Sequence, residues 1–274
     1  MDSLLHKNLP MSARISFFYA EYGHLEVDGH AVVLRQGDLL THLPISTACV
    51  IVLMPGTSIS HAAVKACAEE GTMILWAGEM GVRCYSAGNP GGANAQHLLQ
   101  QAALRLDEHS RLMVARRIFQ KMFGHEAPSS RSVDQLRGIE GGMVKDIYRT
   151  LAQEYGVPWA GRIAFGHGHR IDPVNQAISH ANAALYGLTE AVILSMGYSP
   201  AIGFVHSGDP RSFVFDVADC IKFDTVVPFA MGVARESPLD LEGRVRRGCR
   251  DLFAKRKMAM ELVSIIQGLL EASC

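Results

Sequence analysis

The sequence lacks any pair of cysteines at C-x-x-C spacing, and its six cysteines stand apart at positions 49, 67, 84, 220, 249 and 274. This scatter argues against a zinc finger, and the mostly apolar surroundings predict reduced, buried thiols. The sequence also lacks an apolar run of roughly 18 residues, the length that spans a bilayer. Its N-terminus lacks the ordered parts of a secretion signal. We therefore expect a cytoplasmic protein.

Net charge is also close to absent. Its value of −1 argues against a chain that coats nucleic acid through composition alone. Basic residues nevertheless gather between positions 244 and 257, where seven Lys or Arg stand against the single acid Asp251. The seven are Arg244, Arg246, Arg247, Arg250, Lys255, Arg256 and Lys257. Two interpretations stay open: a phosphate-binding stripe, or the solvated face of a helix.

The chain does contain enough apolar residues for a core, with 48% hydrophobic residues over a length of 274. Residues 1–87 are predicted to form a β-rich domain, because short β-branched runs alternate there with Gly, Asp and Pro. The candidate strands are 14–19, 24–28, 31–35, 48–53, 73–76 and 82–86. Their spacing predicts an antiparallel sandwich or a small barrel. One helix interrupts them at 61–70, with Ser60 as its cap and Gly71 at its end.

The remainder of the chain is predicted to be helical. The Gly-, Pro- and Asn-rich segment 88–95 is predicted to be a linker, followed by a helical domain over 96–274. Helices are expected over 96–122, 132–155, 173–196, 239–255 and 257–272, and another is expected around Asp216 and Asp219. The expected fold class is α+β, with an N-terminal β-sandwich-like domain followed by a mainly α-helical domain.

Four ionisable residues stand among apolar or glycine-rich neighbours: Glu140, His206, Asp216 and Asp219. Such groups are rarely kept there unless they are paired, hydrogen-bonded or bound to metal. Two carboxylates three residues apart share one face of a helix. Together with a Glu and a His from elsewhere, they suit Mg²⁺ or Mn²⁺ better than Zn²⁺. This set outlines a nuclease or phosphoryl-transfer site.

Each of these residues also has a structural explanation. Asp216, near the start of its helix, fits a cap or the partner of an arginine, and His206 alone fits an ordinary core histidine. Glycines flank Glu140 at 138, 141 and 142, and each costs a helix about 1 kcal/mol. We expect the close approach of another backbone or of DNA to compensate for them.

Two further features leave alternatives open. His167, His169 and His180 offer a rival zinc site, but the Gly-His-Gly-His run lacks the i,i+4 spacing of a helical zinc motif and favours a mobile polar loop. Tyr22 lies between two candidate strands next to Gly23. There it fits either a residue that stacks on a nucleobase or a residue at the rim of the sandwich core.

Several segments resemble CRISPR-associated protein one, the spacer-acquisition integrase, in its type I-E form. They are Arg-Gly-Ile-Glu-Gly at 137–141, Tyr-Gly-Leu-Thr-Glu at 186–190, Ile-Gly-Phe-Val-His-Ser-Gly at 202–208, and the long motif Phe-Val-Phe-Asp-Val-Ala-Asp-Cys-Ile-Lys-Phe-Asp-Thr-Val-Val-Pro at 213–228. The resemblance covers nearly the whole chain, and the long motif makes a chance match very improbable.

The resemblance implies an assembly and a set of site residues. The β-rich domain would form a homodimer, and a dimer of the small CRISPR-associated protein two would bridge two such homodimers. Glu140, His206 and Asp219 would bind the divalent metal, and Asp216 would support them. The implied DNA contacts are Tyr22, which stacks where the incoming duplex opens, together with Arg83, Lys222, Arg246 and Arg250; Arg211 is a further candidate, beside Asp209.

The expected activity is metal-dependent transesterification, in which a free 3′-hydroxyl of a short DNA fragment attacks a phosphodiester at the CRISPR repeat. A metal-dependent endonuclease acting on branched DNA shares the same site. A non-catalytic DNA-binding scaffold, in which the acids merely pair with arginines, is the third hypothesis and predicts metal-independent function. The sequence does not separate the first two, because the nucleophile is not part of the protein.

Overall fold

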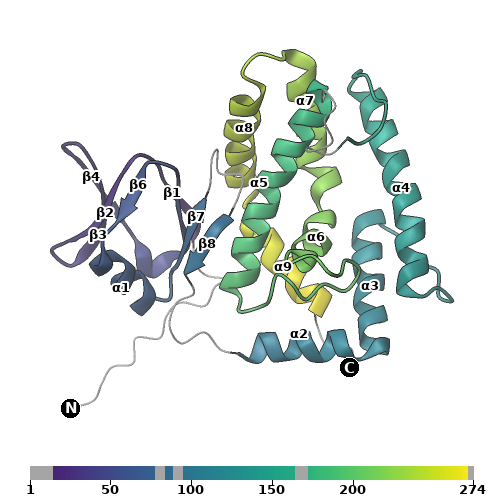
Figure 1. Ribbon diagram of the computed structural model, residues 1–274, viewed down its shortest axis with the longest axis horizontal. Helices are drawn as coiled ribbons and strands as arrows, with labels where there is room; N and C mark the ends of the chain where they lie inside the picture. Colours follow the sequence, from purple (N-terminus) through teal and green to yellow (C-terminus); the bar gives the residue numbers. More distant parts are fainter. Residues whose placement is uncertain (1–14, 78–83, 89–94, 164–171, 271–274) are drawn as a thin grey trace.

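The computed structural model describes residues 15–77, 84–88, 95–163 and 172–270. Strands form the first part of the chain and helices the second, and the two parts lie side by side (Figure 1). This confirms the expected fold class, a β-sheet region followed by a mainly α-helical region. Within the described ranges, no helix is both long enough and apolar enough to cross a membrane.

The N-terminal part contains two four-stranded sheets. In order across the first sheet, the strands are β1 (Ile15–Ala20), β5 (Ala48–Leu53), β7 (Met73–Ala77) and β8 (Cys84–Gly88). In the second sheet the order is β4 (Leu39–Leu43), β3 (Ala31–Gln36), β2 (Gly23–Asp28) and β6 (Thr57–Ile59).

The predicted antiparallel pairing is wrong for most of the first sheet. Strands β1, β5 and β7 are parallel, and only β8 runs antiparallel to its neighbour β7. Parallel neighbours need a long crossover connection, and helix α1 (His61–Glu69) provides it between β5 and β7. In the second sheet the pairing is antiparallel, except that β6 runs parallel to β2.

Strand β5 shows how the first sheet is packed. Ile51 and Leu53 belong to a core shared with the second sheet and α1. Val50 and Val52 point to the other face and pack with Ala191 of α5 (Pro173–Ser195). A strand whose sheet is buried on both faces has a continuous run of apolar residues in its sequence, which explains why residues 48–53 are all apolar. The first sheet and the helical part therefore pack against each other and share apolar contacts. The predicted linker 88–95 that joins them in sequence lies mostly outside the described residues. The domain boundaries stay a prediction.

Helix α5 runs through the centre of the helical part (Figure 1), and its residues after Pro173 are all buried or half-buried. A helix covered in this way is expected at the centre of a core. The other helices of this part are α2 (Gln96–Leu106), α3 (Glu108–Phe123), α4 (Val133–Glu154), α6 (Ser212–Asp219), α7 (Val226–Glu236), α8 (Leu241–Arg256) and α9 (Met258–Leu270). Helix α7 is an addition to the sequence prediction, and its Pro228 is tolerated because it lies in the first turn.

The single helix predicted over 96–122 is wrong, because the chain bends between α2 and α3. Asp107 is extended, with φ −82° and ψ 118°, and its carboxylate accepts a hydrogen bond from the Ser110 backbone N–H at 2.7 Å. This cap starts α3 in a new direction. The predicted starts of α4 and α5 are confirmed, with a capping box between Ser132 and Gln135 and with Asp172 as the cap of α5.

Candidate metal centre

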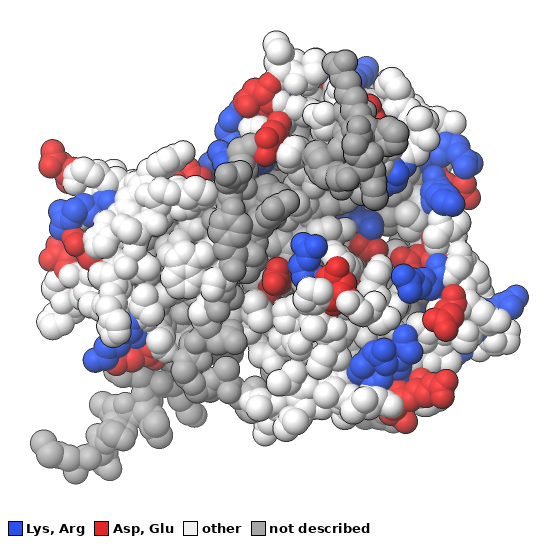
Figure 2. Space-filling model, viewed as in Figure 1, with Lys and Arg blue, Asp and Glu red and all other residues white. Residues whose placement is uncertain are grey.

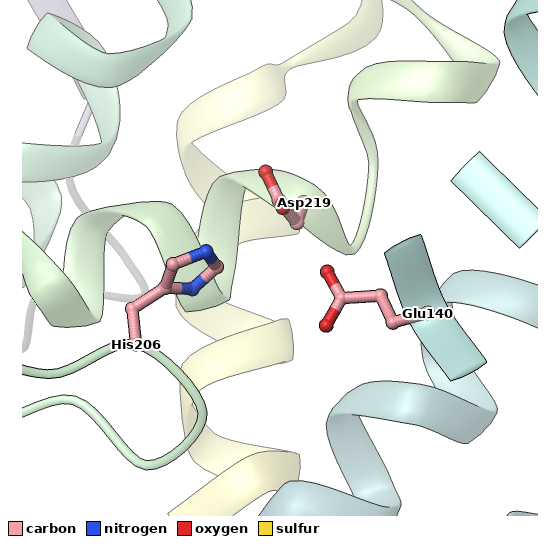
Figure 3. Close-up of side chains that lie close together, drawn as sticks. All are labelled: Glu140, His206 and Asp219. Carbon is pink, nitrogen blue, oxygen red and sulfur yellow. The ribbon is translucent and has the colours of Figure 1, made fainter. Parts of the chain in front are cut away.

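Three residues that are distant in sequence meet on the helical part. Figure 2 shows a hollow there in which basic and acidic side chains lie together. Glu140 of α4, His206 of the loop before α6, and Asp219 at the end of α6 each offer one ligand atom, and these atoms all lie within 4.8 Å of one another. In Figure 3 the Glu140 carboxylate and the His206 ring approach the space beside Asp219 from opposite sides.

Asp216 organises the loop that carries His206. Its side chain is fully buried. Its Oδ2 accepts hydrogen bonds from the backbone N–H groups of Phe204 and Val205 at 2.6 and 3.2 Å. Its Oδ1 accepts from the backbone N–H of His206 at 2.9 Å and pairs with His206 Nδ1 at 2.8 Å. The interpretations of Asp216 as a helix cap or the partner of an arginine are therefore wrong.

The same contact fixes the chemistry of the His206 ring. With Asp216 as its acceptor, Nδ1 carries the proton, and Nε2 keeps its lone pair for a metal ion. Burial alone would lower the pKa of His206, but the hydrogen bond and charge of Asp216, with smaller contributions from Asp219 and Glu140, raise this pKa above its ordinary value. The side chain of His206 is 28% exposed and its environment is anionic, and both features favour a ligand over an ordinary core histidine.

Glu140 is half-buried in α4, and its pKa is raised, first by burial and then by the neighbouring charge of Asp219. A cation between the two carboxylates would relieve both effects. A Cβ added at Gly138, Gly141 or Gly142 would meet nothing within 4 Å. No backbone among the described residues approaches these glycines, so of the two expected causes only the approach of DNA stays a prediction, and this face of α4 is open with respect to the described chain.

Asp219 is buried beside a lysine. Its Oδ1 accepts a hydrogen bond from Lys222 Nζ at 2.6 Å, and both side chains are about nine-tenths buried. Burial alone would lower the pKa of Lys222, but the charge of Asp219 raises it, so the ammonium stays charged. Lys222, predicted among the DNA contacts or at the active site, lies beside the candidate ligand Asp219, in the short 3₁₀ helix η4 (Lys222–Asp224).

Two arginines that the sequence analysis missed hold the same loop from the opposite side. Arg105 of α2 donates from Nε to the Gly203 carbonyl at 2.8 Å, and Arg111 of α3 donates to the Phe204 carbonyl at 3.0 Å. A Cβ at Gly203 would lie 2.5 Å from the His206 carbonyl oxygen, so this turn admits only glycine. No local spacing signals these contacts, because they link residues more than ninety positions apart.

Comparison with known proteins identifies the family to which this chain belongs. The family model described as CRISPR associated protein Cas1 matches residues 17–125 and 120–243. The chain belongs to the Cas1 family. It is 48% identical to the CRISPR-associated endonuclease Cas1 of Escherichia coli strain K12 over 96% of this chain and 87% of that protein. It is 45% identical to the Geobacter sulfurreducens protein of the same name over 97% and 88% of the two chains.

Solved structures agree. A crystal structure described as a TtCas1–DNA complex superposes with a TM-score of 0.83 at 33% identity, covering 97% of this chain and 99% of that one. The predicted family, with the type I-E form that the Escherichia coli match fits, is therefore confirmed. The prediction of an enzyme is confirmed at the level of a family whose members are named endonucleases.

The DNA contacts implied by the Cas1 resemblance lie in several places. Tyr22, between β1 and β2, is 74% exposed with φ 47°, and so is not a buried rim residue. Arg83 lies outside the described residues. Arg211 is half-exposed, with its guanidinium 5.2 Å from the ring of Phe215, which in turn contacts the His206 ring, and 3.8 Å from the Asp209 carboxylate.

Arg246 and Arg250 of α8 face the β-sheet part across a pocket of about 120 Å³ that Tyr19 and Glu21 also line. The basic stripe around them is less charged than its sequence indicates. Ion pairs neutralise four of its arginines: Arg244 with Glu236, Arg247 with Asp240, Arg250 with Asp251 and Arg256 with Glu261. Arg246 has no ion pair within the described ranges, and it is therefore the stronger phosphate-binding candidate of the two.

Only one of the three histidines of the alternative zinc site lies within the described residues. His167 and His169 lie outside the described residues. His180 of α5 lies with its Nδ1 3.6 Å from a carboxylate oxygen of Glu242 in α8. In the described part of the Cas1 chain, the cluster of Glu140, His206 and Asp219 is the one group of potential ligands close enough to hold a metal ion.

Proposed function

We propose that this protein is a divalent-metal-dependent DNA integrase of CRISPR adaptation, which inserts short DNA fragments at the repeat through attack of a 3′-hydroxyl. The observation that supports this most strongly is the cluster of Glu140, His206 and Asp219, whose ligand atoms lie within 4.8 Å of one another. Two carboxylates and one imidazole form a donor set that fits Mg²⁺ or Mn²⁺. The hydrogen bond from His206 Nδ1 to Asp216 fits it too, since metal-ligating histidines usually donate their other ring N–H to a carboxylate or carbonyl.

When bound, Mg²⁺ or Mn²⁺ would polarise the phosphoryl oxygen and offset the charge that develops on the phosphate. The protein contributes the rest of the chemistry. Asp216 holds the proton of the neutral His206 ring on Nδ1, so Nε2 is the nitrogen that remains for the cluster. The buried ammonium of Lys222 places a fixed positive charge within 2.6 Å of Asp219 Oδ1, where a phosphate oxygen can meet it.

The open face of α4 allows a DNA backbone to approach the site closely. Gly141 is exposed and leaves the space above it free, next to the ligand Glu140. Arg211, Arg246 and Arg250 are candidates for phosphate contacts that position both DNAs without reading bases. A homodimer formed through the β-rich part, and a dimer of CRISPR-associated protein two bridging two homodimers, would present two such sites to the two ends of one fragment.

Two other hypotheses use the same residues. A metal-dependent endonuclease on branched DNA is favoured by the names of the relatives, which are called CRISPR-associated endonucleases. It differs only in that water replaces the 3′-hydroxyl as nucleophile. The scaffold hypothesis requires the acids to pair with arginines, whereas within the described ranges no arginine forms an ion pair with Glu140, Asp216 or Asp219.

A strand-transfer assay tests the proposal. Purified protein, with and without its small partner, would be mixed with a forked DNA carrying free 3′-hydroxyls and a supercoiled plasmid bearing the repeat. Mn²⁺ or Mg²⁺ would be compared with EDTA, and the wild type with Glu140→Ala. A joined product that needs metal and is lost in the variant is the expected result. Cutting without joining supports the endonuclease, and DNA binding without metal-dependent chemistry supports the scaffold.

A further inference from the structure

The loop that carries His206 has no helix or strand of its own. This segment, the His206 loop (residues 196–211), joins α5 to α6. Backbone N–H and C=O groups outside helices and sheets need other partners when they are buried. Asp216 of α6 is the partner for the N–H groups of Phe204, Val205 and His206. For the carbonyl groups earlier in the loop, the partners are side chains of α2 and α3.

Gln101 of α2 binds the first part of the His206 loop. It is fully buried, with 0% relative exposure. Its Nε2 donates to the Ser199 carbonyl at 3.0 Å and to the Ile202 carbonyl at 2.9 Å. Its Oε1 accepts a hydrogen bond from the Ser199 backbone N–H at 2.8 Å. A side-chain amide has two N–H donors and one acceptor oxygen, so these bonds use both donors and hold two residues of the loop at once.

Two other side chains of α2 continue this contact along the loop. His97 and Arg105 lie four residues before and after Gln101, so the three side chains share one side of the helix. The His97 Nδ1 atom lies 2.6 Å from the Met196 carbonyl oxygen. The Nε atom of Arg105 donates to the Gly203 carbonyl at 2.8 Å. One side of α2 therefore binds carbonyl groups from the start of the His206 loop to a point three residues before His206.

The neighbouring Gln100 shows what a glutamine of α2 does when it faces elsewhere. Its Nε2 donates to the Leu270 carbonyl at the end of α9, at 2.9 Å. Gln100 and Gln101 thus have the same side chain in the same helix, and both donate to backbone carbonyls. Only Gln101 of the two is hydrogen-bonded to the His206 loop. The pair separates contact with this loop from helix propensity and from side-chain hydrogen bonding in general.

We infer that Gln101 is a positioning residue for the metal centre, which holds the His206 loop where the ring of His206 can reach Glu140 and Asp219. Asp216 binds three consecutive N–H groups of the loop, and these groups converge on it only while the backbone before them keeps its course. Gln101 fixes that course from the other side. The inference rests on the proposed function in taking Glu140, His206 and Asp219 as the metal ligands.

Mn²⁺ titration calorimetry on the full chain tests this apart from any DNA chemistry. The variant is Gln101→Met, whose side chain is of similar length but has no N–H donor and no oxygen. We expect it to weaken Mn²⁺ binding about tenfold, the lower end of the range for side chains that support a metal ligand. The matched control Gln100→Met should bind Mn²⁺ like the wild type. In a His206→Ala background, Gln101→Met should weaken binding no further, because its effect passes through that ring.

Pulsed electron paramagnetic resonance gives a readout that a loss of stability alone would not change. At saturating Mn²⁺, the nitrogen of a coordinating imidazole modulates the electron spin echo. We expect this modulation in the wild type and in Gln100→Met. It should be weakened in Gln101→Met and absent in His206→Ala. Circular dichroism would show that each variant is folded before it is measured.

If Gln101→Met does not fold, Arg105→Met replaces it in both experiments, with the same expected results, because it removes the next bond to the loop. The inference is overturned if the variant binds Mn²⁺ as tightly as the wild type and keeps the full nitrogen modulation. It is also overturned if the variant weakens binding equally with and without His206. Either outcome, alongside wild-type Mn²⁺ binding that depends on His206, leaves the proposed function standing. Wild-type binding that does not depend on His206 would overturn the metal site and this inference together.

Discussion

Replacement of Asp216 by Asn tests whether one buried carboxylate builds the metal site. The carboxylate accepts four hydrogen bonds, two at each oxygen, from Phe204, Val205 and His206. An amide of the same shape has a single acceptor oxygen. If the amide nitrogen replaces Oδ2, the backbone N–H groups of Phe204 and Val205 lose their acceptor. If it replaces Oδ1, the backbone N–H of His206 loses its acceptor and the ring must change tautomer so that Nδ1 accepts. Each unsatisfied buried group costs about 1–3 kcal/mol, so the free energy of unfolding should fall by about 3 kcal/mol. The change also removes the acceptor charge that sets the tautomer of His206, which should weaken Mn²⁺ binding about 10- to 100-fold.

Urea unfolding and Mn²⁺ titration calorimetry measure the two effects of Asp216→Asn. The matched control is Asp209→Asn, three residues after His206, because its carboxylate is 46% exposed and lies 3.8 Å from Arg211 Nε. Its Oδ1 also accepts a hydrogen bond from the Arg211 backbone N–H at 2.8 Å, which the oxygen of Asn can accept as well. Exposed pairs of this kind contribute at most about 1 kcal/mol, and we expect no change in Mn²⁺ affinity. If Asp216→Asn unfolds at the wild-type urea concentration and binds Mn²⁺ as tightly, the hydrogen-bond argument for the loop is refuted.

Three other predictions follow from the structure. Gly203→Ala should lower the free energy of unfolding by about 1–3 kcal/mol, since its Cβ would meet a backbone oxygen at 2.5 Å. A urea midpoint equal to that of the wild type would contradict this. The control is Gly138→Ala, whose Cβ would meet nothing within 4 Å. Burial raises the pKa of Cys67 to about 11 and of Cys249 to about 12. At pH 8 both thiols should therefore stay protonated and resist iodoacetamide until urea unfolds the chain, and mass spectrometry that finds either labelled in the native protein would disprove this. Mn²⁺ at a hundred times its Kd should raise the free energy of unfolding of the wild type by about 2.7 kcal/mol. Thermal melts with and without Mn²⁺ measure this, and Glu140→Ala should abolish the stabilisation. Equal stabilisation of both proteins would place the ion elsewhere.

Local signals in the sequence predicted much of the secondary structure. Ser60, Ser132 and Asp172 each cap the helix expected after them, because a capping side chain acts within three residues. The direction of strand pairing was not predictable in the same way. The parallel order of β1, β5 and β7 depends on contacts between distant segments, and an apolar run such as 48–53 fits either direction. The bend at Asp107 was missed because the helical periodicity continues on both sides of it.

The candidate site, too, was predictable from the sequence only in part. Sequence alone determined that Glu140, His206, Asp216 and Asp219 are out of place unless something pairs with them, since ionised groups are costly among apolar neighbours. The long motif at 213–228 determined the family.

Only the tertiary structure decided what each residue does. It brought Glu140, His206 and Asp219 together, turned Asp216 toward the loop rather than the cluster, and placed Lys222 against Asp219. It also recruited Arg105 and Arg111 from far away in the chain. The physical reason is that apolar neighbours in the sequence are enough to show that a charge will be buried and will need a partner. Which partner relieves the cost depends on how α2, α3, α4 and α6, which are distant in the sequence, pack together in the fold.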